Sequence, residues 1–167
     1  MSMMFGLIPI MWHAVRPSKT VDMVAVVNSF WIPKGYEGLT FFGRVLTPNQ
    51  EAADRFNTGY SYLKNHEMIH LRQAQSCGDS WIRFYMVYLW YWVKGIWKRR
   101  KLRQLTSPVP LPGNIAYLLN PFEIEAYAHM YDLHYLDQWK DGAKGWLEYA
   151  RMPVEERLGI VIKLFNL

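Results

Sequence analysis

The chain has 167 residues, of which 51% are hydrophobic and 20% charged, and it contains eight Trp, eleven Tyr and eight Phe. This composition excludes intrinsic disorder, and the length is typical of one domain, so we expect a single domain over residues 1–167. Much of the net charge of +5 comes from one block, Lys98 to Arg103, and the single cysteine, Cys77, excludes an intramolecular disulfide and a cysteine-rich metal site.

The N-terminal segment, MSMMFGLIPIMWHAVR, contains a short apolar run. No basic residue precedes that run and no small-residue cleavage site follows it, which makes the segment a poor secretory signal. We therefore expect the segment to stay in the mature protein.

The residues from Val21 to Leu46 are β-branched and aromatic, with turn formers between them. VDMVAVVNSFWIP and LTFFGRVL are typical of strands, and the stretch from Pro33 to Gly38 between them is typical of a turn. We therefore expect strands in this part of the chain, the later one covering Leu39 to Leu46.

Helical patterns dominate the rest of the chain. Thr47-Pro48 is typical of a helix start, Gly78 of a helix end, and the prolines of SPVPLPG of a break between helices. The expected helices cover about residues 48–56, 60–77, 80–105, 121–137 and 153–165. The sequence thus predicts a small, helix-dominated α+β domain with a few N-terminal strands.

An aromatic run, Phe84 to Val93 (FYMVYLWYWV), precedes the basic block Lys98 to Arg103. The run is too short for a transmembrane helix, which needs roughly 20 apolar residues. Rings followed by cations are typical of segments that lie in the plane of a membrane interface, where the partner is anionic lipid. A core helix with internally packed rings is the interpretation that we rank slightly ahead for the aromatic run, and a solvated loop is the interpretation that we rank ahead of a membrane surface for the basic block. We expect no nucleic-acid partner.

The stretch Asn65 to His70, NHEMIH, falls within the helix expected over 60–77. His66 and His70 are four residues apart and project from the same face, so two imidazoles can meet one ion. Zinc suits them because it accepts neutral nitrogen ligands and tolerates three protein ligands plus a water. Glu67 is turned by about 100° from His66, so it is a poor third ligand but can take a proton from a zinc-activated water.

The best candidates for a third ligand lie in NPFEIEAYAH, residues 120–129. On a helix, Glu123 shares a face with Tyr127, whereas Glu125 shares a face with His129. Only one of these pairs can face a metal fully, and acidic residues also favour the first turn of any helix. From the residues alone, either glutamate can be the third ligand.

HEMIH followed by a glutamate on a later helix, in the context NPFEIEAY, resembles the gluzincin class of zinc metallopeptidases, especially its short forms. The chain is also similar to short bacterial proteins that carry HEMIH, an aromatic helix and a PFExEAY segment. The resemblance implies a zincin-like domain in which His66, His70 and Glu123 bind Zn²⁺. It also implies Glu67 as the general base, with Glu125 as the alternative third ligand.

In gluzincins an aspartate four residues after the ligand glutamate commonly supports a histidine, and Tyr127 stands at that position here. A tyrosine hydroxyl can donate or accept a hydrogen bond, but it cannot give an imidazole a negative partner. We therefore predict that Tyr127 is a catalytic residue and not a replacement for the aspartate. The oxyanion-stabilising group is not singled out among Tyr127, His129, Tyr131 and His134. Thermolysin-like enzymes bind the peptide along an edge strand ahead of the motif helix, which implies Leu39 to Leu46 here.

Together these features predict a zinc-dependent hydrolase, and the resemblance makes it a metallopeptidase acting on a peptide or protein. The alternative is a membrane-surface or partner-binding protein with a structural or vestigial metal site, in which the aromatic run and the basic block carry the function. We expect a cytoplasmic protein that can associate peripherally with the inner face of the membrane through Phe84 to Val93 and Lys98 to Arg103.

Overall fold

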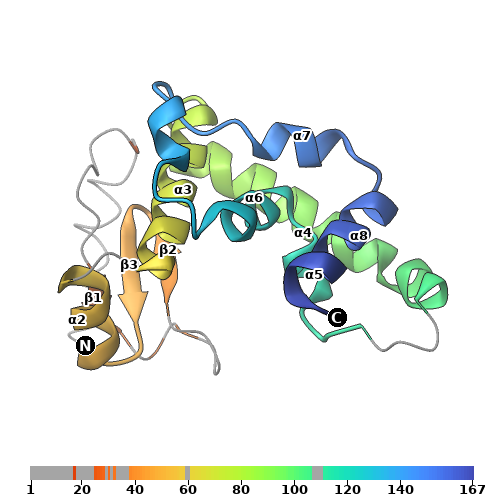
Figure 1. Cartoon of the computed structure of the whole chain (residues 1–167), viewed down its shortest axis with the longest axis horizontal. Coiled ribbons are helices and arrows are strands. Elements are labelled where there is room, and N and C mark those ends of the chain that lie inside the picture. Colours follow the sequence, from red (N-terminus) through yellow and green to blue (C-terminus); the bar gives the residue numbers. More distant parts are fainter. Residues whose placement is uncertain are drawn as a thin grey trace.

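The computed structural model describes residues 17, 25–28, 30, 32, 38–58, 61–106 and 111–167. The expectations for the N-terminal segment 1–16 and for the turn at 33–37 lie outside these residues. Within them, a small sheet is followed by a long series of helices (Figure 1), so the expected helix-dominated α+β fold is confirmed.

The described strands form one three-stranded sheet in the order β1-β3-β2. These strands are β1 (Ala25–Val27), β2 (Leu39–Phe41) and β3 (Arg44–Thr47). β1 runs parallel to β3, whereas β2 pairs with β3 antiparallel, with Leu39 opposite Leu46 and Phe41 opposite Arg44. β2 is therefore an edge strand of this sheet.

The prediction of one strand over Leu39 to Leu46 is wrong, because the chain reverses direction at Phe42 and Gly43. Both residues have a positive φ, 46° and 78° respectively. Positive φ at both central positions gives a two-residue hairpin turn whose twist matches that of the strands it joins. Glycine adopts this conformation freely, whereas the ring of Phe42 is held by packing on Tyr85, with ring centroids 5.1 Å apart.

Helices make up most of the remaining described chain. They are α2 (Gln50–Thr58), α3 (Tyr62–Ser76), α4 (Trp81–Leu105), α5 (Ile115–Leu118), α6 (Pro121–His129), α7 (Trp146–Arg151) and α8 (Val154–Phe165), with a short 3-10 helix, η2 (Tyr135–Gln138). Serine hydroxyls cap two of them: Ser61 accepts from the N–H of Lys64 at the start of α3, and Ser80 caps α4 in the same way. α5 and α7 lie outside the expected helices. None of the helices in the described ranges is long and apolar enough to cross a membrane.

The prediction of a helix over residues 121–137 is wrong for its second half, because α6 ends at His129. The side-chain amide of Asn65, on α3, donates to the carbonyl oxygens of His129 (3.2 Å), Met130 (3.0 Å) and Asp132 (2.9 Å). The last carbonyls of a helix have no partner inside the helix, and the Asn65 amide supplies one to His129, the last residue of α6. Asn65 therefore ties the end of α6 to the first turn of α3.

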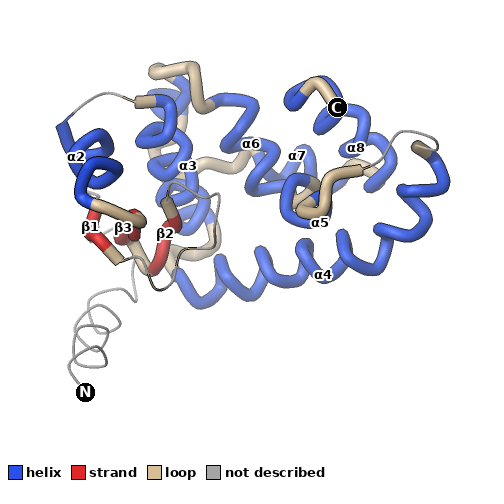
Figure 2. Tube along the Cα trace, turned by 90° about the horizontal axis from the view of Figure 1, so that it is seen from below, coloured by secondary structure: helices blue, strands red, loops and turns tan. Residues whose placement is uncertain are grey.

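α3 and α6 lie side by side (Figure 1). Figure 2 shows α4 along one border of the molecule, with the other helices on one side of it. The core between them is aromatic. Phe84 of α4 packs on Phe122 of α6 with ring centroids 4.9 Å apart, and Phe122 packs on Trp146 of α7 at 4.4 Å. A second apolar cluster, which includes Leu102, Ile115 and Leu158, joins the far half of α4 to α5 and α8.

Gly95 of α4 marks the closest approach of this helix to α5. A Cβ atom there would lie 3.0 Å from the Ala116 carbonyl oxygen and 3.1 Å from its Cα. We predict that Gly95→Val lowers the free energy of unfolding by about 1–3 kcal/mol, because packed backbone must move to admit the side chain. Gly159→Ala in α8 is the control: nothing lies within 4 Å of the added methyl, so helix propensity should raise stability by about 0.5–1 kcal/mol. Urea denaturation measures both, and equal effects would contradict the close contact.

Candidate metal centre

Helix α3 brings two imidazoles together. His66 and His70 lie one turn apart and are buried, with exposed fractions of 4% and 6%. Their Nε2 atoms are 3.1 Å apart, and the ring planes meet at 84°. The two nitrogens therefore face one common position.

Helix α6 adds a carboxylate to this pair. Glu123, in the first turn of α6 and 3% exposed, places Oε1 3.4 Å from His70 Nε2 and Oε2 3.5 Å from His66 Nε2. Ligand atoms around a tetrahedral zinc are about 3.3 Å apart, given metal–ligand distances of roughly 2.0–2.1 Å, so these separations match a zinc shell. Among the residues that the structure describes, this is the one group of His, Cys, Asp or Glu side chains that could hold a metal ion.

The electrostatics of the group favour a cation. Burial lowers the pKa of His70, but the Glu123 carboxylate outweighs this effect and raises the pKa to about 9. Burial has the opposite effect on Glu123 and raises its pKa, but the imidazoles of His70 and His66 hold that pKa well below its ordinary value. Glu123 Oε2 and His66 Nδ1 are buried without a hydrogen-bond partner in the described part of the chain. A buried carboxylate that faces two imidazoles, with one oxygen lacking a donor, fits a divalent cation.

Glu125 faces away from the histidines. It is fully buried, and its Oε2 accepts from the Gln73 side-chain amide at 2.7 Å and from the Trp146 backbone N–H at 2.9 Å. Its Oε1 accepts from the Tyr135 hydroxyl at 2.5 Å. Positions i and i+2 of a helix point in directions about 200° apart, so Glu123 and Glu125 cannot both face the imidazoles. Of the two glutamates that the sequence left open, the structure places Glu123 beside the histidines.

The support for His70 comes from Gln73, one turn further along α3. His70 Nδ1 lies 2.8 Å from Gln73 Oε1, and the amide nitrogen of Gln73 donates to the Phe122 carbonyl oxygen at 2.9 Å and to Glu125. Because that nitrogen is committed to oxygen acceptors, Gln73 Oε1 must accept, and His70 carries its proton on Nδ1. Nε2 is then the ring nitrogen that can bind an ion, in exchange for its own proton. Gln73 was not among the residues predicted from the sequence, although its spacing of three from His70 places it on the same helix face.

Tyr127 and Tyr88 lie against the other two members of the group. The Tyr127 ring packs edge-on against His66, with ring centroids 4.5 Å apart. Tyr88, on α4, donates its hydroxyl proton to Glu123 Oε1 at 2.7 Å. Tyr88 was hidden in the aromatic run, where only its spacing of four from the buried Phe84 indicates an inward direction.

The remaining candidates have other contacts. His129 stacks on Tyr135 with ring centroids 3.8 Å apart, and His134 is exposed and pairs with Asp137 at 2.9 Å. Tyr131 is 73% exposed and lies against the ring of Tyr62. Of the four residues considered for an oxyanion contact, it is Tyr127 whose ring packs against a histidine of the group.

A cavity of about 150 Å³ opens beside the three candidate ligands. Glu67, itself buried, lines it together with His66, His70 and Glu123. The hydroxyl of Thr40, on β2, donates to Glu67 Oε2. The other walls are largely aromatic and are formed by Phe84, Tyr85, Tyr88 and Tyr117. The cavity therefore joins a buried carboxylate, two imidazoles and an apolar surface.

The edge strand beside this cavity already has a side-chain partner. The Tyr85 hydroxyl donates to the carbonyl oxygen of Thr40 at 3.2 Å and accepts from the N–H of Phe42 at 3.0 Å. Leu39 and Thr40 of β2 line the cavity. A peptide that added to this edge, as the gluzincin resemblance implies for Leu39 to Leu46, would have to displace Tyr85 from Thr40.

The chain matches no protein-family model, no curated protein and no solved structure. The resemblance to gluzincins is therefore supported by the arrangement of His66, His70 and Glu123, which is consistent with a zincin-like site. What the site can do follows from its own geometry and chemistry.

The two glutamates of α6 should differ in their contribution to stability. We predict that Glu125→Leu lowers the free energy of unfolding by about 2–4 kcal/mol, because Gln73, Tyr135 and the Trp146 N–H lose a buried acceptor. Glu123→Leu in metal-free protein should cost less than half as much, since His70 then loses its proton and only the Tyr88 hydroxyl loses a hydrogen-bond acceptor. Chemical denaturation in the presence of a chelator compares the two, and equal losses would contradict the separate roles.

Proposed function

We propose that the protein is a zinc-dependent hydrolase. The observation that carries this proposal is the buried group of His66, His70 and Glu123 with a fourth side chain, Glu67, on the same cavity. Two imidazoles and one carboxylate suit zinc, and three protein ligands leave one position for water. A purely structural zinc site normally fills all four positions with protein ligands, so the composition of this group favours catalysis.

A zinc ion held by this group would lower the pKa of a water and polarise the carbonyl group that the water attacks. Glu67 accepts the proton of the attacking water and passes it to the leaving group, the role for which a buried carboxylate beside the ligands is suited. The Thr40 hydroxyl holds Glu67 through its hydrogen bond to Oε2. Gln73 keeps Nε2 of His70 turned towards the ligand position.

Tyr117 is a candidate donor for the oxyanion. It lines the cavity, and burial, with an added contribution from Glu123, raises its pKa far above the ordinary value, so the hydroxyl stays protonated. The Tyr127 hydroxyl lies 3.4 Å from that of Tyr117. We assign the oxyanion contact to Tyr117, with Tyr127 positioned behind it.

A peptide is the substrate class that the gluzincin resemblance favours, which makes the protein a metallopeptidase. The aromatic walls of the cavity, Phe84, Tyr85 and Tyr88, suit an apolar side chain next to the bond that is cleaved. The same ligand group could also hydrolyse other amides, and the tests below separate metal binding from peptide hydrolysis.

Metal binding is tested first. Protein purified without chelator is expected to contain stoichiometric zinc, and His70→Ala is expected to lose it because two ligands hold the ion too weakly. His134→Ala is the matched control, since His134 is an exposed histidine paired with Asp137. Inductively coupled plasma mass spectrometry measures the zinc content of all three proteins. Wild-type protein without stoichiometric metal would sink the proposal.

The role of Glu67 is tested by Glu67→Gln. We predict that this variant retains zinc but loses about 10²–10⁴-fold in the rate of peptide hydrolysis, because the amide cannot accept the proton. Cleavage of a mixed peptide library, followed by mass spectrometry, reports the rate and the residues flanking the cleaved bond. Glu148→Gln, an exposed substitution on α7, should leave the rate unchanged. A zinc-loaded wild type that cleaves no peptide would remove the peptidase assignment while leaving the metal site standing.

A further inference from the structure

The outer side of α4 carries a row of large apolar side chains. Exposed along it are Ile82, Met86, Leu89, Trp90, Ile96 and Trp97. Their spacings of three, four and seven residues place them on one face of the helix. The opposite face, which includes Phe84, Gly95 and Leu102, is buried. In Figure 2, α4 lies along one border with the other helices on one side of it, so this apolar face is directed away from the other helices.

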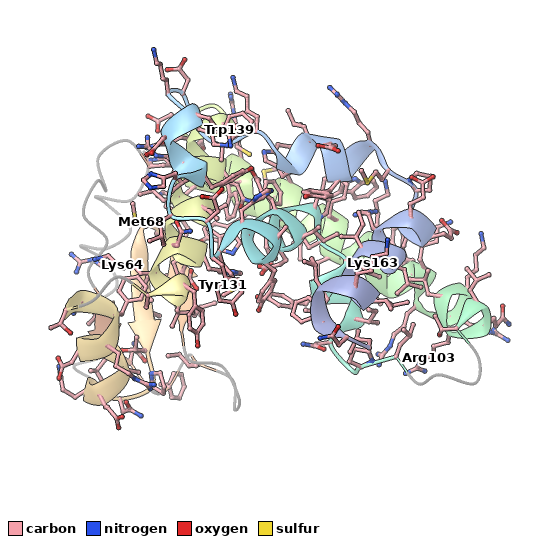
Figure 3. All side chains as sticks on the ribbon, in the orientation of Figure 1. Lys64, Met68, Arg103, Tyr131, Trp139 and Lys163 are labelled. Atoms are coloured by element: carbon pink, nitrogen blue, oxygen red, sulfur yellow. The ribbon has the colours of Figure 1, made fainter. Side chains whose placement is uncertain are left out.

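The same helix is strongly basic. It contains seven of the nineteen basic residues of the chain and none of the fourteen acidic ones. Arg99, Arg100 and Arg103 lie with Ile96 around an open hollow near its C-terminal end. Figure 3 shows Arg103 at the end of α4 that is remote from the sheet. The apolar face therefore continues directly into a cluster of guanidinium groups.

The charge of α4 decides between the partners that an exposed apolar face could have. A second copy of the chain docked through the same face would bring two helices together that both carry basic and no acidic residues, and like charges oppose association. An anionic lipid surface can bind both the apolar row and the guanidinium cluster of this face. Tryptophan rings such as those of Trp90 and Trp97 favour the head-group level, and arginine binds lipid phosphate in two-pronged hydrogen bonds.

We propose that α4 binds an anionic phospholipid membrane and lies in the plane of its surface. The six apolar side chains named above enter the boundary between head groups and acyl chains, and Arg100 and Arg103 bind the phosphates. Only the exposed face of α4 contacts the membrane, and its buried face stays packed on the rest of the protein. The proposal does not depend on the metal centre, whose side chains lie on the inner side of α4.

Vesicle flotation of the full chain tests the proposal. Wild-type protein should float with vesicles of phosphatidylcholine and phosphatidylserine, and should float much less with phosphatidylcholine alone or in high salt. Trp97→Glu and, separately, Met86→Glu should weaken binding at least about tenfold, because each places a charge in the apolar layer. The two residues are 70% and 67% exposed, so both variants should keep the wild-type circular dichroism spectrum. The pair Arg100→Glu and Arg103→Glu should weaken binding to a similar extent.

Two control variants separate loss of the α4 surface from the effect of any added surface charge and from loss of the metal centre. Tyr131→Glu changes an aromatic residue that is 73% exposed but lies outside α4, and it should float like the wild type. His70→Ala should also float normally while it loses metal, so failure of the metal centre and failure of membrane binding give different results. Wild-type protein that does not float with anionic vesicles overturns the proposal. So does an α4-dependent dimer in sedimentation that Trp97→Glu dissociates, since it would show that a second copy covers this face.

Discussion

The candidate metal centre depends on one buried amide, that of Gln73. Its oxygen holds Nδ1 of His70, and its nitrogen reaches both the Phe122 carbonyl oxygen and the Glu125 carboxylate. Gln73 and Glu125 are fully buried, so a shift that broke one of these bonds would leave an unpaired polar group at a cost of about 1–3 kcal/mol. These bonds fix the rotation of α6 relative to α3, and that rotation aims Glu123 at the imidazoles. Side chains that touch no ion thus set the geometry of those that could.

The sequence predicted the parts of this arrangement that follow from local periodicity. His66 and His70 had to share a face because four residues make about one helical turn. The choice between Glu123 and Glu125 could not be made, because contacts from Gln73 and Trp146, 52 and 21 residues from Glu125 along the chain, set the rotation of α6. Distant contacts also explain the other errors. The Phe42-Gly43 turn lacks the usual Asn-Gly signal, and α6 ends where Asn65 binds its carbonyls.

The aromatic run in α4 supports two interpretations of its sequence at once. Phe84 and Tyr88 point inward, the first into the core and the second onto Glu123, as a core helix requires. Trp90 and Trp97 are exposed, as an interfacial segment requires. Composition alone could not divide the run, since large rings occur on both faces. The division follows from which face of the helix meets α5 and α6, and this again is a tertiary property.

The two faces of α4 also have a geometric consequence. An α-helix is about 10 Å across, so the hydroxyl of Tyr88, which faces Glu123, lies roughly one helix diameter from whatever the outer face rests on. On a membrane, the cavity would be carried parallel to the lipid surface at roughly one helix diameter from it. Encounters with substrates anchored to the same bilayer would then be a search in two dimensions. Specificity would be set by how far a susceptible bond stands from the lipid as well as by its side chains.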